Sequence, residues 1–456
     1  MRHSTLDIHS QFLKGLRLVS DACGNDSLRI GAELKFPLVD REGRAVSREV
    51  VKALWSYLGD QGWSLEHDTP TGALVGARKP GERNDTVASF ETGYAKTEFS
   101  LAHVANLIDL KRSIDELTKL AHDFASRHEA HFLGYGIHPV SPPSSKLLMK
   151  KERTSFWDTV FPSNQVIPPE EGDDVHLFTV NAASHVHVGL RSEEAIKAVN
   201  VLNGFAGAQI ALMANSPVWK GRADGEHRCV AERIWDWWPP AQGRVGVPEA
   251  PFAGVLHYVQ CVAKLKPVYV KRDGNPVILQ GYDSFAEFYA SPRAEGEDLE
   301  GERVPLEPDP KDIETHNSCY WYNTRISRYY TVENRVCDQQ PPDALIGPAA
   351  LTLGLVSALN EAWEEVQQWD WNTLRKTRDA ACRTGLSAAS ETSRIPALCK
   401  RMLEVAETGL RRRGLGEERF LEPLRERVRL STCPAIQMED VFRKGGVEAL
   451  LDVCTI

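Results

Sequence analysis

The sequence predicts an α+β fold, with an antiparallel or mixed sheet followed by a helical C-terminal region. Short segments of β-like composition are mixed with long amphipathic helices, without the regular strand–helix alternation of a parallel βαβ protein. From Gly347 to the end, the pattern is mostly helical. The 456 residues allow two or three domains and enough chain to bury a substantial core.

The expected elements follow from apolar periodicity and from the positions of Gly, Pro and Asn. Strands are expected at 28–39, in short runs within 71–101, at 131–139, near 174–191 and near 318–337. Helices are expected at 46–61, 104–128, near 144–160 and at 192–214. Residues 240–316 are rich in Pro, Gly and acidic residues, which predicts an exposed excursion or lid. We therefore expect a core of residues 1–365 and a helical region of residues 366–456.

Charge and cysteine usage exclude several classes of protein. The net charge is −9 and no long Lys/Arg block occurs, which argues against a nucleic-acid-binding surface. No apolar run approaches 18 residues, so we expect no membrane span. The nine cysteines are scattered and form no CxxC pair, which argues against a disulfide framework or a zinc site. A cytoplasmic location is the simplest expectation, since the N-terminus resembles no signal peptide.

The stretch NAASHVHVGL (181–190) places two histidines two residues apart. In a strand, His185 and His187 would point to the same face. Their spacing is compatible with a metal site, with a catalytic histidine beside a bystander, or with a strand that simply carries two imidazoles.

Three further segments place acidic residues on predicted strands. Glu33 lies within GAELKFPL, and Glu91 and Glu98 lie seven apart in SFETGYAKTEF, where a hairpin would bring both carboxylates together. In YYTVENRVCD, Glu333 and Arg335 share a strand face. Each segment alone is equally compatible with solvated strand residues or a surface ion pair.

Taken together, these segments indicate one oxygen-rich site. Carboxylates with a histidine suit Mg²⁺ or Mn²⁺, as in phosphoryl-transfer sites where metals bridge nucleotide phosphates. The sequence contains no GxxxxGK[ST] loop, no full GxGxxG, no HExxH and no GxSxG elbow.

The motifs also resemble a known family. GAELKF, SFETGYAKTEFSL, GYGIHP, SHVHVGL, ALMANSPVWKG and TVENRVCD occur in the order and spacing of the glutamate–cysteine ligase and carboxylate–amine ligase family, relatives of glutamine synthetase. The resemblance covers residues 28–365. It implies an antiparallel sheet curved into a funnel with helices outside, ATP at one end, the amino-acid substrate at the other and Mg²⁺ (or Mn²⁺) between them. It also implies that a carboxylate is activated as an acyl phosphate, which an amine then attacks.

The resemblance further implies roles for individual residues. The expected metal ligands are Glu33, Glu91, Glu98, His187 and Glu333. Arg335 and Arg325 are the expected catalytic arginines, with Arg335 facing phosphate. Either Arg228 or Arg233 is expected to face the substrate, whereas His185 is expected to face it or to have a structural role. The nearby cluster Trp235, Trp237 and Trp238 is expected in the core or pocket wall.

Lys35 departs from the family pattern, because many members have a second acid at this position. A lysine cannot ligate a metal, but it could contact nucleotide phosphate directly. The number of metals is therefore open.

The hypothesis that these observations favour is an ATP- and Mg²⁺-dependent ligase, with glutamate and cysteine as substrates and γ-glutamylcysteine as product. Its partners would be small amino acids and amines, not nucleic acid or membrane. A ligase for another amine in a specialised or peptide-tailoring pathway, a metal-dependent hydrolase and an inactive scaffold are the alternatives.

Overall fold

A computed structural model describes residues 5–23, 28–81, 84–151, 154, 156, 160, 167–237, 243–387 and 394–456. Its main sheet contains β1 Arg29–Val39, β2 Ser64–His67, β3 Leu74–Lys79, β4 Thr86–Phe90, β5 Lys96–Ser100, β6 His131–Phe132, β7 Ala183–Gly189, β16 Thr324–Ile326 and β17 Val332–Asp338. The strand order is β16–β17–β7–β1–β5–β4–β3–β2, with β6 beside β1. Every pairing in this sheet is antiparallel, which confirms the predicted α+β fold with an antiparallel sheet.

Strict alternation in β1 gives the sheet two different faces. Leu34 and Phe36 are fully buried in the main hydrophobic core, while Glu33 and Lys35 point to the opposite side. Helices α5 Ala195–Gly204, α6 Ala206–Met213 and α11 Gly347–Ser357 pack on the apolar side of the sheet. We call the opposite side, which carries Glu33 and Lys35, the polar face.

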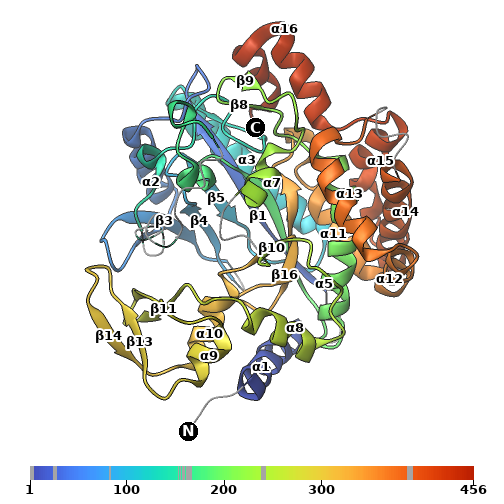
Figure 1. The fold of residues 1–456 in the computed structure, drawn as a ribbon. Coiled ribbons are helices and arrows are strands. Elements are labelled where there is room, and N and C mark those ends of the chain that lie inside the picture. The colour runs from blue at the N-terminus through green and yellow to red at the C-terminus, as the bar shows by residue number, and fades with distance from the viewer. Residues whose placement is uncertain are drawn as a thin grey trace.

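The remaining helices surround this sheet (Figure 1). They are α1 Thr5–Cys23, α2 Arg48–Asp60, α3 Leu107–Arg127, α7 Val230–Trp237, α8 Val255–Ala263, α9 Phe285–Ala290, α10 Pro310–Asn317, α12 Leu359–Gln367, α13 Trp371–Thr384, α14 Ile395–Arg413, α15 Glu422–Arg429 and α16 Pro434–Cys454. No single helix in the described ranges is both long and apolar enough to cross a membrane, whereas two bent pairs, α5–α6 and residues 342–367, meet that test by length and composition.

The predicted excursion contains regular structure of its own. Strands β11 Tyr269–Arg272, β12 Asn275–Ile278, β13 Ala294–Glu297 and β14 Arg303–Leu306 form a second antiparallel sheet, seen in yellow beside the main sheet in Figure 1. The high content of Pro, Gly and acidic residues concealed these four short strands. Two small pairs, β8 Val218–Trp219 with β9 Arg222–Ala223 and β10 Val245–Gly246 with β15 Trp321–Tyr322, complete the described strands.

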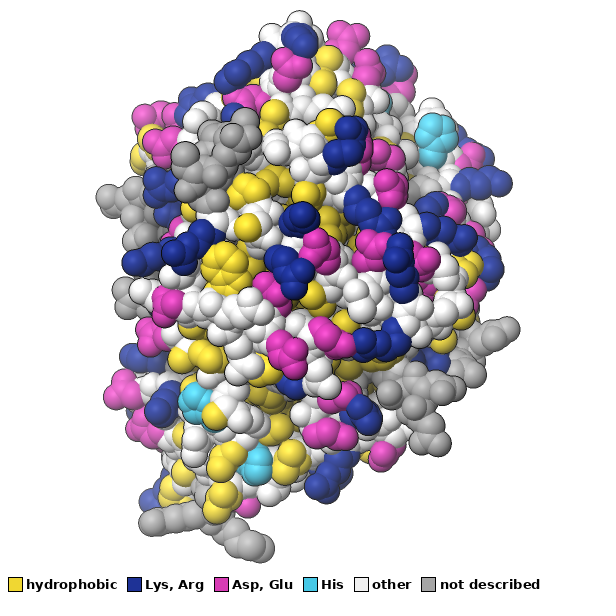
Figure 2. Space-filling view, turned by 90° about the vertical axis from the view of Figure 1, so that its right-hand side faces the viewer, with side chains coloured by type: hydrophobic (Ala, Val, Ile, Leu, Met, Phe, Trp, Pro, Cys, Tyr) yellow, Lys and Arg dark blue, Asp and Glu magenta, His cyan; other side chains and the backbone are white. Residues whose placement is uncertain are grey.

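The C-terminal helices pack onto the sheet-covering helices. Helix α13 lies on α6, and α14 lies on α11. Residue 365, after which the boundary was predicted, lies inside α12, and the division into two regions stays a prediction. Figure 2 shows acidic and basic side chains interspersed on the face of these helices. Ion pairs such as Arg412–Glu361 connect them across this surface.

Some predicted elements differ from the observed ones. The long helix expected at 192–214 is two helices, because the chain bends at Phe205 (φ −87°, ψ 5°) between α5 and α6. Of the helix expected near 144–160, the structure describes a short 3₁₀ turn at Ser145–Leu147, and most residues after Lys151 lie outside the described ranges. Helix α1 was not predicted.

Candidate active site

Five strands carry predicted site residues onto the polar face. Arg325 on β16 lies opposite Glu333 on β17, which lies opposite His187 on β7. On the other side of β7, Lys35 of β1 lies opposite Glu98 of β5. The structure thereby brings together Glu33, Lys35, Glu91, Glu98, His185, His187, Arg325, Glu333 and Arg335. We call this group the strand cluster.

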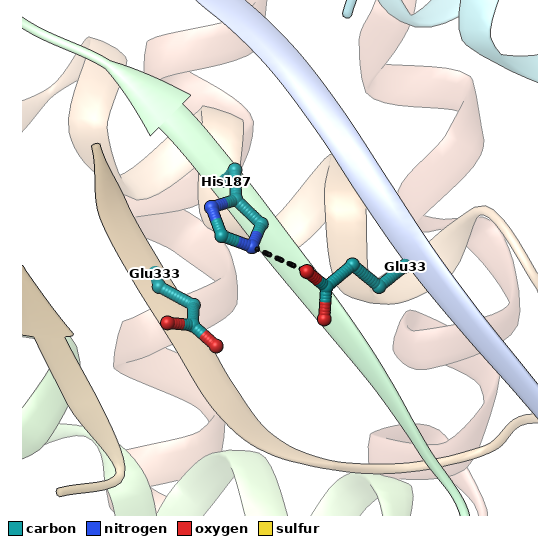
Figure 3. Close-up of side chains that lie close together, drawn as sticks. All are labelled: Glu33, His187 and Glu333. Atoms are coloured by element: carbon teal, nitrogen blue, oxygen red, sulfur yellow. Dashed lines mark hydrogen bonds and ion pairs between the residues drawn. The ribbon is translucent and has the colours of Figure 1, made fainter. Parts of the chain in front are cut away.

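One end of the strand cluster has donor atoms arranged for a metal ion. Ligand atoms of Glu33, His187 and Glu333 all lie within 4.8 Å of one another. In Figure 3, the three side chains point toward a common space, with His187 Nε2 3.1 Å from Glu33 Oε1. The two carboxylates offer the oxygen ligands that Mg²⁺ and Mn²⁺ prefer, and His187 adds one nitrogen. We call these three residues the Glu333 end.

Two arginines hold Glu333 ionised. Arg325 Nε lies 2.8 Å from Glu333 Oε2, and Arg335 contacts Glu333 Oε1. Burial alone would raise the pKa of Glu333, but the two guanidinium groups hold it well below its ordinary value. Arg325 is anchored further by the carbonyl oxygens of Asn317 and Tyr320. These positive charges lie where an anionic group such as phosphate could bind.

The other end of the strand cluster is organised by Lys35. Its Nζ lies 2.5 Å from Glu98 Oε2 and 3.4 Å from Glu33 Oε2, and it also contacts Glu91 Oε1. Burial alone would lower the pKa of Lys35, but Glu91 and Glu98 raise it above its ordinary value. Burial and the charge on Glu33 raise the pKa of Glu98 above its ordinary value, while the charge of Lys35 opposes this shift. We call Lys35, Glu91 and Glu98 the Lys35 end.

The turn between β4 and β5 makes the Lys35 end possible. Glu91 follows β4 directly, and the antiparallel pairing of β4 with β5 brings it beside Glu98, as the predicted hairpin requires. Gly93 lies in this turn against the Thr179 backbone, where a Cβ atom would be 2.2 Å from the Thr179 oxygen. A larger residue at position 93 would displace the turn and the carboxylate of Glu91.

The two histidines have different environments. His185 Nδ1 lies 3.0 Å from Glu33 Oε2, and burial with the charge of Lys35 lowers the pKa of His185 to about 3. Burial would also lower the pKa of His187, but the charge of Glu33 raises it above its ordinary value. His185 is therefore a neutral residue between the two ends of the cluster, and its contact with substrate stays a prediction.

The structure does not bring Arg228 or Arg233 into the strand cluster. Arg228 pairs with Glu439 of α16, and Arg233 Nη1 lies 2.7 Å from Asp236 on its own helix. Trp235 faces the site instead, with its ring 5.7 Å from the Arg335 guanidinium. Arg233 projects from the other side of α7, because two residues turn a helix by about 200°. Substrate binding by either arginine stays a prediction.

Trp235 and Trp237 each pack against another tryptophan, as side chains in a core or pocket wall do. The Trp235 ring stacks on Trp321 at 5.8 Å, and the Trp237 ring stacks on Trp219 at 6.0 Å. Trp238 lies outside the described residues.

Sequence reasoning missed several residues that support the cluster. Thr331 Oγ1 lies 2.8 Å from His187 Nδ1, and Ser100 Oγ donates to Glu98 Oε1 at 2.7 Å. Lys96, two residues before Glu98, is buried on the same face and donates to the Phe178 carbonyl and to Asn181 Oδ1. The i and i+2 spacing of Lys96, Glu98 and Ser100 was the available signal, because strand residues two apart share a face.

Comparisons with known proteins identify the family of the chain. The model of glutamate–cysteine ligase family 2 matches residues 29–453. A putative glutamate–cysteine ligase 2-3 from Rubrobacter xylanophilus is 24% identical over 434 residues, which cover 93% of this chain and 95% of that protein. The chloroplastic glutamate–cysteine ligase of Medicago truncatula is 26% identical over 241 residues, which are 51% of this chain and 44% of that enzyme.

Solved structures show the same fold at low identity. The structure of glutamate–cysteine ligase from Francisella tularensis in complex with AMP superposes with a TM-score of 0.53 at 10% identity, covering 94% of this chain and 87% of that one. The sheet order, the polar face and the family match over most of the chain lead to one conclusion. The chain belongs to glutamate–cysteine ligase family 2.

Proposed function

We propose that this protein is an ATP-dependent ligase that joins the carboxylate of an amino acid to an amine, with glutamate and cysteine as the first substrates to test. The observation that carries the proposal is the convergence of Glu33, His187 and Glu333 beside Arg325 and Arg335. Fold similarity alone would not define the chemistry, because one fold hosts many functions.

The arginines account for the first step of the proposed reaction. A carboxylate is a poor acyl donor until phosphorylation gives it a leaving group. Phosphoryl transfer needs positive charge fixed near the transferred oxygens. Arg335 and Arg325 would supply that charge from rigid strands, and Glu33, His187 and Glu333 would hold Mg²⁺ or Mn²⁺. When bound, such an ion neutralises phosphate charge.

Burial of this end of the site supports the second step. The side chains of Glu333 and Arg325 are only 3% and 9% exposed. A water-poor environment lets an amine compete with water for the acyl phosphate. The relatives are glutamate–cysteine ligases by name, which supports cysteine as that amine, and the AMP complex of the Francisella tularensis enzyme supports ATP as the nucleotide. Metal ligation by Glu91 and Glu98 and phosphate binding by Lys35 stay predictions.

The test is an ADP-release assay over a panel of amino acids and amines with MgCl₂. We expect ADP only when ATP, a carboxylate donor and an amine are all present, with glutamate and cysteine giving the highest rate. ADP release with glutamate and a different amine would keep the ligase and change the substrate. Metal-dependent cleavage of an amide without ATP would instead establish a hydrolase.

A further inference from the structure

Three carboxylates surround the ammonium group of Lys35. Lys35 Nζ has three N–H donors, and Glu91, Glu98 and Glu33 lie around it. The Lys35 side chain is 8% exposed, and its place is fixed by the direct cross-strand pairing of Lys35 with Glu98. The ammonium therefore fills the space between the carboxylates of Glu91 and Glu98.

The remaining contacts of the Lys35 end are also made between groups of the protein. Glu98 accepts from Lys35 on one oxygen and from Ser100 on the other. Two more lysines flank this end: Lys96 is buried on the same strand face, and Lys151 contacts the carbonyl of Phe90, next to Glu91. A divalent cation between Glu91 and Glu98 would have to displace Lys35 and would be repelled by it and by Lys96.

The Glu333 end has a different arrangement of ligand atoms and cations. The nitrogen of His187 and the carboxylates of Glu33 and Glu333 face one another. Its arginines contact Glu333 from β16 and β17.

We propose that Lys35 is a built-in cation that replaces a divalent ion at Glu91 and Glu98, so that the nucleotide-free protein takes up one divalent ion, at Glu33, His187 and Glu333. Glu91 and Glu98 are then positioning residues for Lys35 rather than metal ligands. The ion at the Glu333 end rests on the proposed function, but the exclusion of an ion at the Lys35 end does not.

The experiment counts Mn²⁺ bound to the full-length chain without nucleotide, by equilibrium dialysis and by electron paramagnetic resonance. We expect one ion per chain in the wild type, with the spectrum of an isolated ion. Lys35→Glu should double the count and add the spin coupling of two ions about 3.5–4 Å apart. Lys14→Glu makes the same charge change at an exposed position of α1, outside the strand cluster, and should leave the count at one.

Glu91→Gln keeps the proposal testable even if Lys35→Glu does not fold. Because Glu91 is assigned to Lys35, this variant should still bind one ion. Two ions in the wild type, the loss of an ion in Glu91→Gln, or a folded Lys35→Glu with an unchanged count would each overturn the proposal. No ion in the wild type but one in Lys35→Glu would support the built-in cation and count against the metal of the proposed function.

Discussion

Two buried glutamates of this protein, Glu333 in the strand cluster and Glu417 near the C-terminal helices, have contrasting surroundings. Glu417 is fully buried, accepts from the Leu107 backbone N–H at 2.7 Å and pairs with Arg413. Each of its oxygens has a donor from the protein, as each oxygen of Glu333 does. Glu333 also has arginine partners, but it faces Glu33 and His187.

The difference separates an acid that stabilises the fold from an acid that we assign to chemistry. Glu417 links the start of α3 to α14, segments about 300 residues apart, through one charge pair and one backbone contact. In the strand cluster, acids of different strands converge although their charges repel. Such convergence is costly unless a cation or a ligand compensates it.

Breaking the Glu417 group should have the largest effect on stability. Glu417→Gln leaves Arg413, whose side chain is only 14% exposed, without its charged partner, which should cost about 3 kcal/mol. We expect the free energy of unfolding in urea to fall by that amount, while kcat of the folded protein stays at the wild-type value. A loss of turnover at unchanged stability would erase the distinction between the two glutamates.

The same substitution in the strand cluster should have the opposite outcome. Glu333→Gln removes one charge from the Glu333 end, and turnover should fall about 100-fold or more, equivalent to about 2.7 kcal/mol in the barrier. Arg325 keeps its two carbonyl acceptors, and loss of the Glu333 charge relieves its repulsion with Glu33, so the free energy of unfolding should fall by less than in Glu417→Gln. Unchanged steady-state ADP release would remove Glu333 from the site.

Asp338 is a third kind of buried acid and sharpens the comparison. It accepts from Asn215 N, Ser216 Oγ and Cys229 Sγ, and burial raises its pKa to about 6. Its folded pKa lies above the unfolded value of about 3.9, so its stabilising contribution is present below pH 4 and is lost as the pH rises through 6.

Asp338→Asn removes this titration. Relative to the wild type, the free energy of unfolding of the variant should therefore increase by about 2 kcal/mol between pH 4 and pH 7. Urea unfolding at several pH values measures the difference. A constant difference across this range would show that Asp338 does not titrate in the folded protein.

The smallest effect is expected at the surface. Arg412 and Glu361 pair between α14 and α12, with side chains 54% and 43% exposed. Water and salt screen such a pair, so Arg412→Gln should cost less than about 1 kcal/mol and leave turnover unchanged. Thermal unfolding in low and high salt provides the check, and a loss larger than that of Glu417→Gln would reverse the ranking.

The sequence predicted the faces of the strands better than the contacts between strands. Alternation placed His185 with His187 and Glu333 with Arg335, and the spacing of Glu91 and Glu98 allowed a hairpin, whereas the family resemblance joined Glu33, His187 and Glu333 in one site. The position of Lys35 between Glu91 and Glu98 could not be predicted, because it depends on the register of β1 against β5.

Tertiary packing also decided the features that sequence patterns missed. Arg228 was expected to face the substrate because of the family motif around it, but its partner Glu439 lies on a helix more than 200 residues later. Helix α1 buries only Ile8, Phe12, Gly15 and Leu16 and leaves other apolar residues such as Leu6 and Leu18 exposed, so its pattern was weak. Sequence periodicity gives such segments little signal, because their partners are distant in the chain.

The central claim is that the strand cluster activates a carboxylate by phosphorylation. The most direct measurement uses the acyl donor labelled with ¹⁸O in its reacting carboxylate, together with ATP, MgCl₂ and the amine. We predict that the released inorganic phosphate carries ¹⁸O from the donor, visible as an isotope shift in ³¹P nuclear magnetic resonance. Amide formation with unlabelled phosphate would contradict the acyl-phosphate route and with it the proposed role of this site.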